Sequence, residues 1–267
     1  MKRILLTGGS GRLGHELVPR LQAAGYTVRV MSRRVAPTDR LAGLEWVQAD
    51  LASGAGLAEA LEGAGGVIHA ASDVLKRRVD VDGTRRLLEE AQRVGVEQFV
   101  YISIVGVDQI DFGYYKNKLA AEQLIQASGL PWTILRATQF HGFADQILRA
   151  LTWLPLAFLP KKWQFQSIAG ADVAEQLLAA VQQGPAGRLP DIGGPEILSV
   201  DEMARQWLAA QGKRRATVHL PVPGGLSAGF RRGLNTVPDN RVGQISWSQW
   251  LQDRYGDESG VDASSVT

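Results

Sequence analysis

The chain of 267 residues contains no cysteine and only four histidines. Without cysteine it forms no disulfide, and thiolate catalysis and cysteine metal sites are excluded. The histidines are dispersed, and none stands four residues from another, which is the spacing of a helical zinc site. We therefore expect no metal site. The four are His15, His69, His141 and His219.

Long apolar runs and an excess of one charge are also missing. The N-terminal MKRILLTGG holds an apolar run of three residues, too short for the core of a signal peptide. The longest apolar stretch, ALTWLPLAFLP at 150–160, is about half as long as a membrane span and contains two prolines. The formal charge is +2, and the arginines occur as scattered doublets, which gives little reason to expect nucleic acid. We expect a cytoplasmic protein without a membrane span.

The chain does have enough apolar residues, 45%, for one sizeable core. Strand and helix signals alternate through its first half. Because parallel strands need crossover helices between them, this alternation predicts an α/β protein with a Rossmann-type doubly wound parallel sheet. The predicted strands lie at 2–7, 26–31, 44–48, 66–70, 98–103 and 132–136, and the predicted helices at 11–24, 57–61, 81–94 and after Gly113.

The alternation becomes irregular after about Ala137. We predict a strand near 164–168, helices at 171–183 and near 200–211, and a turn-rich GRLPDIGGPE between the helices. The apolar run at 150–160 fits a lid over an apolar substrate, buried packing or a surface for a protein partner. Residues 256–267 are acidic and poor in apolar side chains, which predicts a disordered tail.

A glycine-rich stretch, TGGSGRLG, follows the first predicted strand and opens the first predicted helix. Glycines permit a tight turn and the close approach of backbone to a pyrophosphate, whose charge the free N–H groups of a helix N-terminus stabilise. The alternative is a glycine-rich turn without a ligand. The expected dinucleotide-binding residues here are Thr7, Gly8, Ser10, Gly11, Arg12, Leu13 and Gly14.

The end of the second strand indicates which dinucleotide is bound. An acidic residue there binds the ribose 2′-hydroxyl of NAD, whereas arginine accommodates the 2′-phosphate of NADP. This chain reads VRVMSRR, with Ser32, Arg33 and Arg34, and has no carboxylate before Asp39. We therefore favour NADP(H) over NAD(H).

Two further strand ends are candidates for the cofactor. Asp50 and Leu51 follow the third strand, where a carboxylate can accept the adenine amino group; we favour this role for Asp50, with ordinary turn chemistry as the alternative at both strand ends. The fourth strand ends in HAAS, whose small residues would let the backbone lie close to a ribose. We assign Ala70, Ala71 and Ser72 to the cofactor and interpret His69 as structural.

Three residues after the fifth strand suggest proton transfer. Ser103 ends that strand, and Tyr114 and Lys118 follow at the i, i+4 spacing that places two side chains on one helix face. A serine that orients a carbonyl, a tyrosine that gives a proton and a lysine that lowers the phenol's pKa form a set suited to carbonyl reduction. An ordinary solvated helix remains the alternative for the Tyr–Lys pair. Lys118 is also an expected ligand of the cofactor's ribose, with or without turnover.

The segments TGGSGRLG, HAAS, VDVDGTRRLLEEAQRVGVEQFVYIS, YYKNKLAAE and PWTILRATQFHG together resemble the short-chain dehydrogenase/reductase superfamily, and more narrowly its atypical, NmrA-like branch. The resemblance implies a Rossmann core at 1–137 that binds NAD(P), and a small C-terminal substrate-binding portion at 138–255 that completes the same fold. It also implies that Ser103, Tyr114 and Lys118 form the family's catalytic triad.

The chain departs from the extended members of the superfamily at two places. Asp80 stands where those members commonly carry asparagine, and RATQFHG replaces an Arg-Pro and a Tyr-Gly after the sixth strand. These changes make a sugar-nucleotide epimerase less favoured. Gln139, Phe140 and His141 become the expected substrate contacts, with buried packing as the alternative for Phe140.

These observations predict an NAD(P)H-dependent oxidoreductase that reduces a small apolar carbonyl or quinone, with Tyr114 as proton donor. The alternative is a non-catalytic redox-sensing regulator that binds NAD(P)(H) and acts on a protein partner.

Overall fold

The computed structural model describes residues 2–36, 43–73, 78–152 and 156–256. It consists of two compact units. The first comprises Met1–Asp108, Phe112–Arg136 and Val173–Pro190, and the second comprises Gln109–Asp111, Ala137–Asp172 and Asp191–Thr267. The first unit thus includes residues 173–190, which the sequence analysis placed in the C-terminal portion. The predicted tail lies almost wholly outside the described residues.

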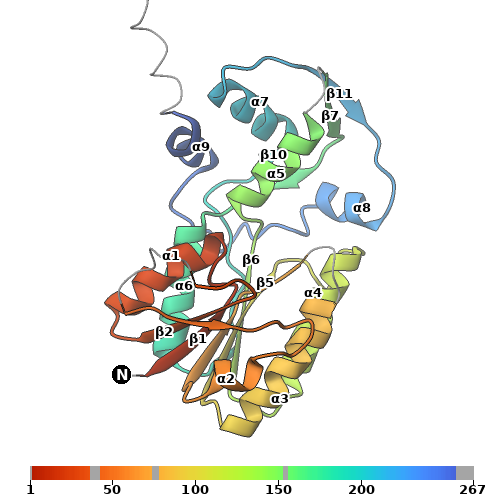
Figure 1. Ribbon diagram of the computed structural model, residues 1–267. Helices are drawn as coiled ribbons and strands as arrows, with labels where there is room; N and C mark the ends of the chain where they lie inside the picture. The colour runs from red at the N-terminus through yellow and green to blue at the C-terminus, as the bar shows by residue number, and fades with distance from the viewer. Residues whose placement is uncertain (1, 37–42, 74–77, 153–155, 257–267) are drawn as a thin grey trace, which may run out of the picture. The chain divides into compact units, whose positions relative to one another are not determined.

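The first unit is built on a parallel seven-stranded sheet with the order β3-β2-β1-β4-β5-β6-β9 (Figure 1). The order reverses direction beside β1, which is the arrangement of a doubly wound Rossmann sheet and confirms the predicted fold class. The strands are β1 (Arg3–Thr7), β2 (Thr27–Ser32), β3 (Glu45–Gln48), β4 (Gly66–His69), β5 (Gln98–Ile104), β6 (Trp132–Ala137) and β9 (Gly187–Arg188).

Helices cover both faces of this sheet. An ion pair between Arg20 and Glu175 links α1 to α6 on one face, while α2, α3 and α4 pack in succession on the other. Strands β4 and β5 are buried almost throughout, as expected for parallel strands covered on both sides. The helices are α1 (Arg12–Ala23), α2 (Leu57–Leu61), α3 (Thr84–Val94), α4 (Gly113–Gln126) and α6 (Gly170–Gln183), and a π-helix, η1 (Arg78–Gly83), leads into α3.

The second unit contains two small sheets and four helices of its own within the described residues. Strand β7 (Leu156–Pro160) pairs in parallel with β11 (Ala216–Leu220), and β8 (Gln164–Phe165) pairs antiparallel with β10 (Leu198–Ser199). Capping boxes start two helices. The hydroxyls of Ser199 and Ser246 each accept the backbone N–H of the residue three positions later, and each serine's own backbone N–H donates to that residue's side chain. The helices are α5 (His141–Leu151), α7 (Val200–Ala210), α8 (Gly225–Arg231) and α9 (Trp247–Tyr255).

The structure differs from the sequence prediction in several elements. Strand β9 lies inside GRLPDIGGPE, where only turns were expected, because two residues suffice to extend the sheet beside β6. The predicted helix at 81–94 is preceded and partly replaced by η1. Part of the apolar run at 150–160 forms β7, whereas residues 153–155 lie outside the described residues.

Candidate functional site

A cavity of about 330 Å³ lies in the first unit at the carboxyl ends of its strands. Ligands collect at this edge in doubly wound sheets, because the sheet order reverses there. The cavity is lined by eleven of the predicted cofactor residues: Gly8, Ser10, Gly11, Ser32, Arg33, Arg34, Asp50, Leu51, Ala70, Ala71 and Ser72. It is also lined by Met31, Ala49, Asp73 and Val79, which the sequence analysis did not name.

The glycine-rich loop is shaped by close backbone contacts. Gly8 has φ +72°, and a Cβ there would lie 2.8 Å from backbone atoms of Ala70 and Ala71 at the end of β4. A Cβ on Gly14 would lie 2.1 Å from the carbonyl oxygen of Gly9. Helix α1 then begins without a side-chain cap and without an acidic residue in its first turn, so its N-terminal dipole remains available to an anion. These features fit a pyrophosphate.

Thr7 is fully buried and does not line the cavity. Its hydroxyl oxygen accepts the backbone N–H groups of Ala70 and Ala71 and lies 2.7 Å from Nδ1 of His69. The other ring nitrogen of His69 lies 2.9 Å from the Thr84 hydroxyl, and burial lowers the pKa of His69 to about 3. Thr7 and His69 therefore stabilise the end of β4. Both ring nitrogens of His69 are used by the Thr7 and Thr84 hydroxyls, which agrees with a structural role for this histidine.

Hydrogen bonds fix the backbone of the arginine doublet that follows β2. The carbonyl of Arg33 accepts a hydrogen bond from Gln48, and that of Arg34 accepts one from the Trp46 indole, while Ser32 Oγ accepts the Arg34 N–H. Both guanidinium groups are exposed on the cavity wall. This arrangement suits a 2′-phosphate, because fixed backbone positions reduce the entropy lost when a guanidinium closes on an anion.

Asp50 reaches the cavity but also closes a turn. Its carboxylate accepts the Ala52 N–H at 3.0 Å and the Ser53 hydroxyl at 3.2 Å. The turn alternative for Asp50 is thus present in the geometry, together with its place on the cavity wall. Arg12, Leu13 and Gly14 belong to the first turn of α1 and do not line the cavity themselves.

Tyr114 meets the cavity through Ser72. The phenol oxygen lies 2.8 Å from Ser72 Oγ, and Ser72 donates its own hydrogen to Asp80 at 2.6 Å. Ser72 is a cavity residue, so a hydrogen-bond path runs from the cavity wall to the tyrosine. The sequence pattern gave no sign of this contact, because Ser72 and Tyr114 are 42 residues apart.

Lys118 is buried beneath Tyr101 and next to the fifth strand. Its ammonium donates to the Ile102 carbonyl at 2.9 Å and lies 4.2 Å from the centre of the Tyr101 ring. Burial lowers the pKa of Lys118 to about 8, although the charges of Asp80 and Glu122 oppose the shift.

The expected lowering of the Tyr114 pKa by Lys118 is wrong for this structure. Burial raises the pKa of Tyr114 to about 12, and the negative charges of Asp80 and Asp73 add to the rise, although the Ser72 hydrogen bond opposes it. Desolvation of the phenolate outweighs the favourable spacing of the two residues on α4.

Two hydroxyl groups at the end of β5 have no hydrogen-bond partner in the described structure: Ser103 Oγ and Tyr101 Oη. Both residues are nearly fully buried, at 2% and 1% exposure. A buried hydroxyl without a partner costs free energy and is uncommon in native proteins. Ser103 does not line the cavity, and its hydroxyl stays unpaired among the described residues.

Helix α4 is fixed by an ion pair at the end of the motif that carries Tyr114 and Lys118. Glu122 accepts two hydrogen bonds from Arg136 of β6, at 2.7 and 2.6 Å, and both side chains are almost fully buried. Arg136 also contacts Asp108 at 2.9 Å. Sequence reasoning did not single out these residues, since only the fold brings them together.

The three predicted substrate residues lie in the second unit. Gln139 is buried and accepts a hydrogen bond from Asn235, and Phe140 precedes α5. His141 donates from Nε2 to the Ile245 carbonyl, so its Nδ1 accepts from the Ser167 hydroxyl. Burial lowers the pKa of His141 to about 4. With both ring nitrogens engaged, His141 has none left for a substrate.

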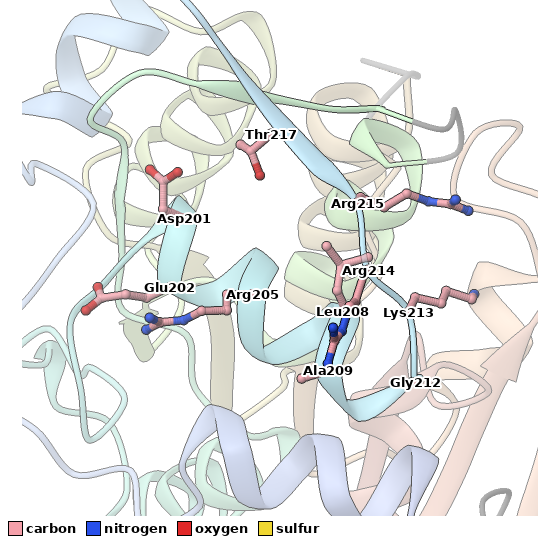
Figure 2. A pocket seen from close by; sticks show the side chains of 10 residues that line it. All are labelled: Asp201, Glu202, Arg205, Leu208, Ala209, Gly212, Lys213, Arg214, Arg215 and Thr217. Atoms are coloured by element: carbon pink, nitrogen blue, oxygen red, sulfur yellow. The ribbon is translucent and has the colours of Figure 1, made fainter.

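The second unit also contains a broad depression of about 740 Å³ beside α7 (Figure 2). Its charged side chains do not converge, because Arg205 lies beside Glu202 while Lys213 and Arg215 extend to the opposite side. The depression contains none of the predicted site residues. We do not assign it to the site.

The described residues contain neither a metal-ligand cluster nor a membrane-spanning helix. No three His, Asp or Glu side chains among them gather as a metal ion would require. No helix among them combines the length and apolarity needed to cross a membrane.

Comparisons with known proteins agree with this geometry. A family model described as NAD(P)H-binding matches residues 8–184. The chain is 28% identical over 221 residues to a (4-alkanoyl-5-oxo-2,5-dihydrofuran-3-yl)methyl phosphate reductase of Streptomyces griseus subsp. griseus, covering 79% of this chain and 74% of that protein.

It is also 29% identical over 190 residues to the photosystem II assembly factor Ycf39 of Trieres chinensis, covering 67% of this chain and 59% of that protein, which is less than two thirds of its length. The crystal structure of an NADPH-dependent quinone oxidoreductase from Escherichia coli matches with a TM-score of 0.75 and 18% identity, covering 94% of this chain and 99% of that one. At this identity the match shows a shared fold.

Proposed function

Because the chain belongs to the NAD(P)H-binding family, with a family match over residues 8–184, we propose that it is an NADP(H)-dependent oxidoreductase that reduces a small apolar carbonyl or quinone. Tyr114 is the proposed proton donor, Ser103 the group that orients the substrate oxygen and Lys118 a ligand of the cofactor's ribose hydroxyls. The observation that carries the proposal is the hydrogen bond of 2.8 Å between Tyr114 and Ser72, which connects a proton donor to the wall of the dinucleotide cavity.

The cofactor part of the proposal rests on the chain's own residues. The loop from Gly8 to Gly14 and the uncapped start of α1 suit the pyrophosphate, and the exposed guanidinium groups of Arg33 and Arg34 suit a 2′-phosphate. When bound, NADPH supplies the hydride for the reduction. The protein's task is then to hold the substrate oxygen and to give it a proton.

The chemistry of Tyr114 fits a donor. A phenol whose pKa is about 12 remains protonated at neutral pH, so its hydrogen is present for transfer, while the raised pKa makes it a weaker acid than an ordinary tyrosine. Ser103 adds a buried hydroxyl without a partner. The relative from Streptomyces griseus is a reductase by name, which supports the proposed class of reaction.

The cofactor preference is tested by the affinities of NADPH and NADH for the parent protein, Arg33→Ala and Arg93→Ala. Arg93 is an exposed arginine of α3 and pairs with Glu90, outside the cavity, so it is the matched control. We expect Arg33→Ala to weaken NADPH binding by about 10- to 100-fold, as for loss of one charged hydrogen bond, without affecting NADH. Equal affinities of the parent for both nucleotides would remove the role given to Arg33.

Turnover is tested with NADPH and a panel of quinones, enones and ketones. Tyr114→Phe should lower kcat by about 100-fold or more while NADPH affinity stays within about twofold of the parent, because only the proton donor is lost. The alternative function, a nucleotide-binding regulator, is supported by the relative named as an assembly factor. It predicts NADPH binding without turnover of any panel member and no effect of Tyr114→Phe on the protein's activity as a regulator.

A further inference from the structure

The direction of the hydrogen bonds around Tyr114 depends on whether the Asp80 carboxyl is ionised. In the ionised form, Ser72 donates its one hydroxyl hydrogen to the Asp80 carboxylate at 2.6 Å. The contact of 2.8 Å between Ser72 and Tyr114 must therefore be donated by Tyr114. While Asp80 accepts, the phenol proton points toward Ser72 and is not offered to a substrate.

Asp80 lies in the π-helix η1 and is fully buried. Its second oxygen accepts the backbone N–H of Asp73 at 3.2 Å. The charged and titratable groups that face it are Lys118 and Tyr114 of α4, Tyr101 of β5 and Asp73 after β4. Lys118 donates to the Ile102 carbonyl at 2.9 Å, and no hydrogen bond or ion pair joins it to Asp80 among the described contacts.

This environment makes the Asp80 carboxyl easier to protonate than an exposed aspartate. Burial raises the pKa of its carboxyl, and the charge of Lys118 and the hydrogen bonds from Ser72 and Asp73 offset only part of that rise. Single turns of π-helix are frequent at functional sites. A buried carboxyl that takes up a proton more readily than usual therefore stands two hydrogen bonds from the proposed donor.

We propose that Asp80 is a positioning residue that acts through Ser72 to set the direction in which the Tyr114 hydroxyl donates its proton. The inference rests on the proposed function of Tyr114 as a proton donor. With Asp80 protonated, Asp80 donates to Ser72 and Ser72 donates to Tyr114, which leaves the phenol hydrogen free for a substrate oxygen. With Asp80 ionised, every hydrogen in the chain points the other way.

The proton transfers balance along this path. Tyr114 gives its proton to the substrate oxygen, Ser72 gives its proton to Tyr114, and Asp80 gives its proton to Ser72. Asp80 ends as a carboxylate and regains a proton from solvent, so one solvent proton is consumed per carbonyl reduced. The electron pair for the reduction belongs to the bound nicotinamide cofactor, and the chain supplies only the proton.

The first test needs no turnover. The pKa of Tyr114 is measured by NMR of tyrosine labelled with carbon-13 at Cζ in the ligand-free protein, with Tyr114→Phe to assign the signal. Asp80→Asn and Asp73→Asn each remove one negative charge that raises this pKa, so Asp73→Asn is the matched control for charge. Asp80→Asn should lower the Tyr114 pKa by about one unit, the order of effect of a nearby like charge.

The deciding comparison repeats both substitutions in a Ser72→Ala background. If Asp80 acts through Ser72, the effect of Asp80→Asn falls by at least about half when the serine hydroxyl is absent, whereas the effect of Asp73→Asn is unchanged. Equal effects of Asp80→Asn in the two backgrounds would mean that Asp80 acts through space alone, and would overturn the inference.

The second test uses the pH profile of the reduction. In the parent protein kcat should fall as pH rises through the pKa of Asp80, because ionised Asp80 reverses the chain. Asp80→Asn should abolish this fall of kcat with pH, because the asparagine amide does not titrate and its N–H can donate to Ser72 at every pH, and KM should be little changed. Asp73→Asn should keep the fall, whatever its effect on the rate. A fall that persists in Asp80→Asn would contradict the inference.

The two tests separate the inference from the function on which it rests. Absence of turnover on every substrate would refute the proposed oxidoreductase, while the NMR comparison would still decide whether Asp80 orients the Tyr114 hydroxyl. If the protein turns over substrate but Asp80→Asn changes the Tyr114 pKa equally with and without the Ser72 hydroxyl, only the role of Asp80 is refuted and the oxidoreductase stands.

Discussion

Each unit of the molecule buries one aspartate almost completely, and the two carboxyl groups behave in opposite ways. Asp80 of the first unit is fully buried, and burial raises its pKa. Asp145 of the second unit is 1% exposed, and burial there is outweighed by hydrogen bonds from Trp207 and Tyr255, which lower its pKa. The exposed fraction of the side chain therefore does not explain why the two pKa values shift in opposite directions.

The difference lies in the partners. Asp145 accepts from the Trp207 indole at 2.7 Å and from the Tyr255 hydroxyl, and two arginines lie at its second oxygen. Among the described residues, the Asp80 carboxyl accepts from the Ser72 hydroxyl and the Asp73 backbone N–H. A buried carboxylate with several hydrogen-bond donors stays ionised and stabilises the fold. A buried carboxyl with few donors has a raised pKa and binds a proton more readily.

The largest expected effect is the loss of Asp145. Asp145→Ala leaves the Trp207 N–H and the Tyr255 O–H without an acceptor, and we expect it to lower the free energy of unfolding by about 3–5 kcal/mol at pH 7. Urea unfolding followed by tryptophan fluorescence measures this. Asp253→Ala, on the exposed side of α9, is the control and should stay within about 0.5 kcal/mol of the parent. A loss for Asp145→Ala no larger than the control would show that its hydrogen bonds do not stabilise the unit.

Two tyrosines extend the comparison to hydroxyl groups. Tyr255→Phe removes a donor to Asp145 and should cost about 1.5–3 kcal/mol, the value of a hydrogen bond to a charged group. Tyr101→Phe removes a buried hydroxyl that has no partner in the described structure, so stability should be unchanged or rise by up to about 1 kcal/mol. Urea unfolding measures both free energies. A larger loss of unfolding free energy for Tyr101→Phe than for Tyr255→Phe would contradict this prediction.

The smallest expected effect concerns the pH dependence of Asp80. A carboxyl with a raised pKa in the folded state binds more protons there than in the unfolded chain, so stability falls as pH rises from about 4 through the folded-state pKa. Asp80→Asn removes this fall, and it should gain about 1.4 kcal/mol relative to the parent for each unit of upward shift, measured at pH 8 against pH 4.

Asp82→Asn is the control for this pH dependence. Asp82 belongs to the same π-helix, but its side chain is 40% exposed, and the variant should remain within about 0.5 kcal/mol of the parent at both pH values. A gain for Asp80→Asn that is the same at pH 4 and pH 8 would mean that charge burial is not the cause.

Much of the first unit could be predicted from the sequence. The parallel sheet, the glycine-rich loop and most of the cavity residues followed from local order, because each strand ends in its own short polar or glycine-containing segment. Residues that reach the cavity from a strand interior or from η1, such as Met31 and Val79, carry no such signal. Thr7 was expected in the cavity, yet its hydroxyl is used inside the fold.

The second unit was less predictable. Its strands are short and pair over long separations, as β11 does with β7, and periodicity does not register elements of two residues such as β8 and β10. The ring of His141 is enclosed by Ser167 and Ile245, which come from segments distant in the sequence. The position of His141 just after β6 suggested a substrate contact. Its two ring nitrogens are already engaged in hydrogen bonds within the unit, so they do not support that contact.

By itself the sequence determined the fold class, the phosphate loop and the arginine doublet, because each depends on residue types at fixed short spacings. It also placed Tyr114 and Lys118 four apart on α4. Only the tertiary structure decided that Tyr114 faces Ser72 and not a lysine, and that its pKa rises. The direction of a buried group's pKa depends on desolvation and on partners from other segments, and neither is encoded in local spacing.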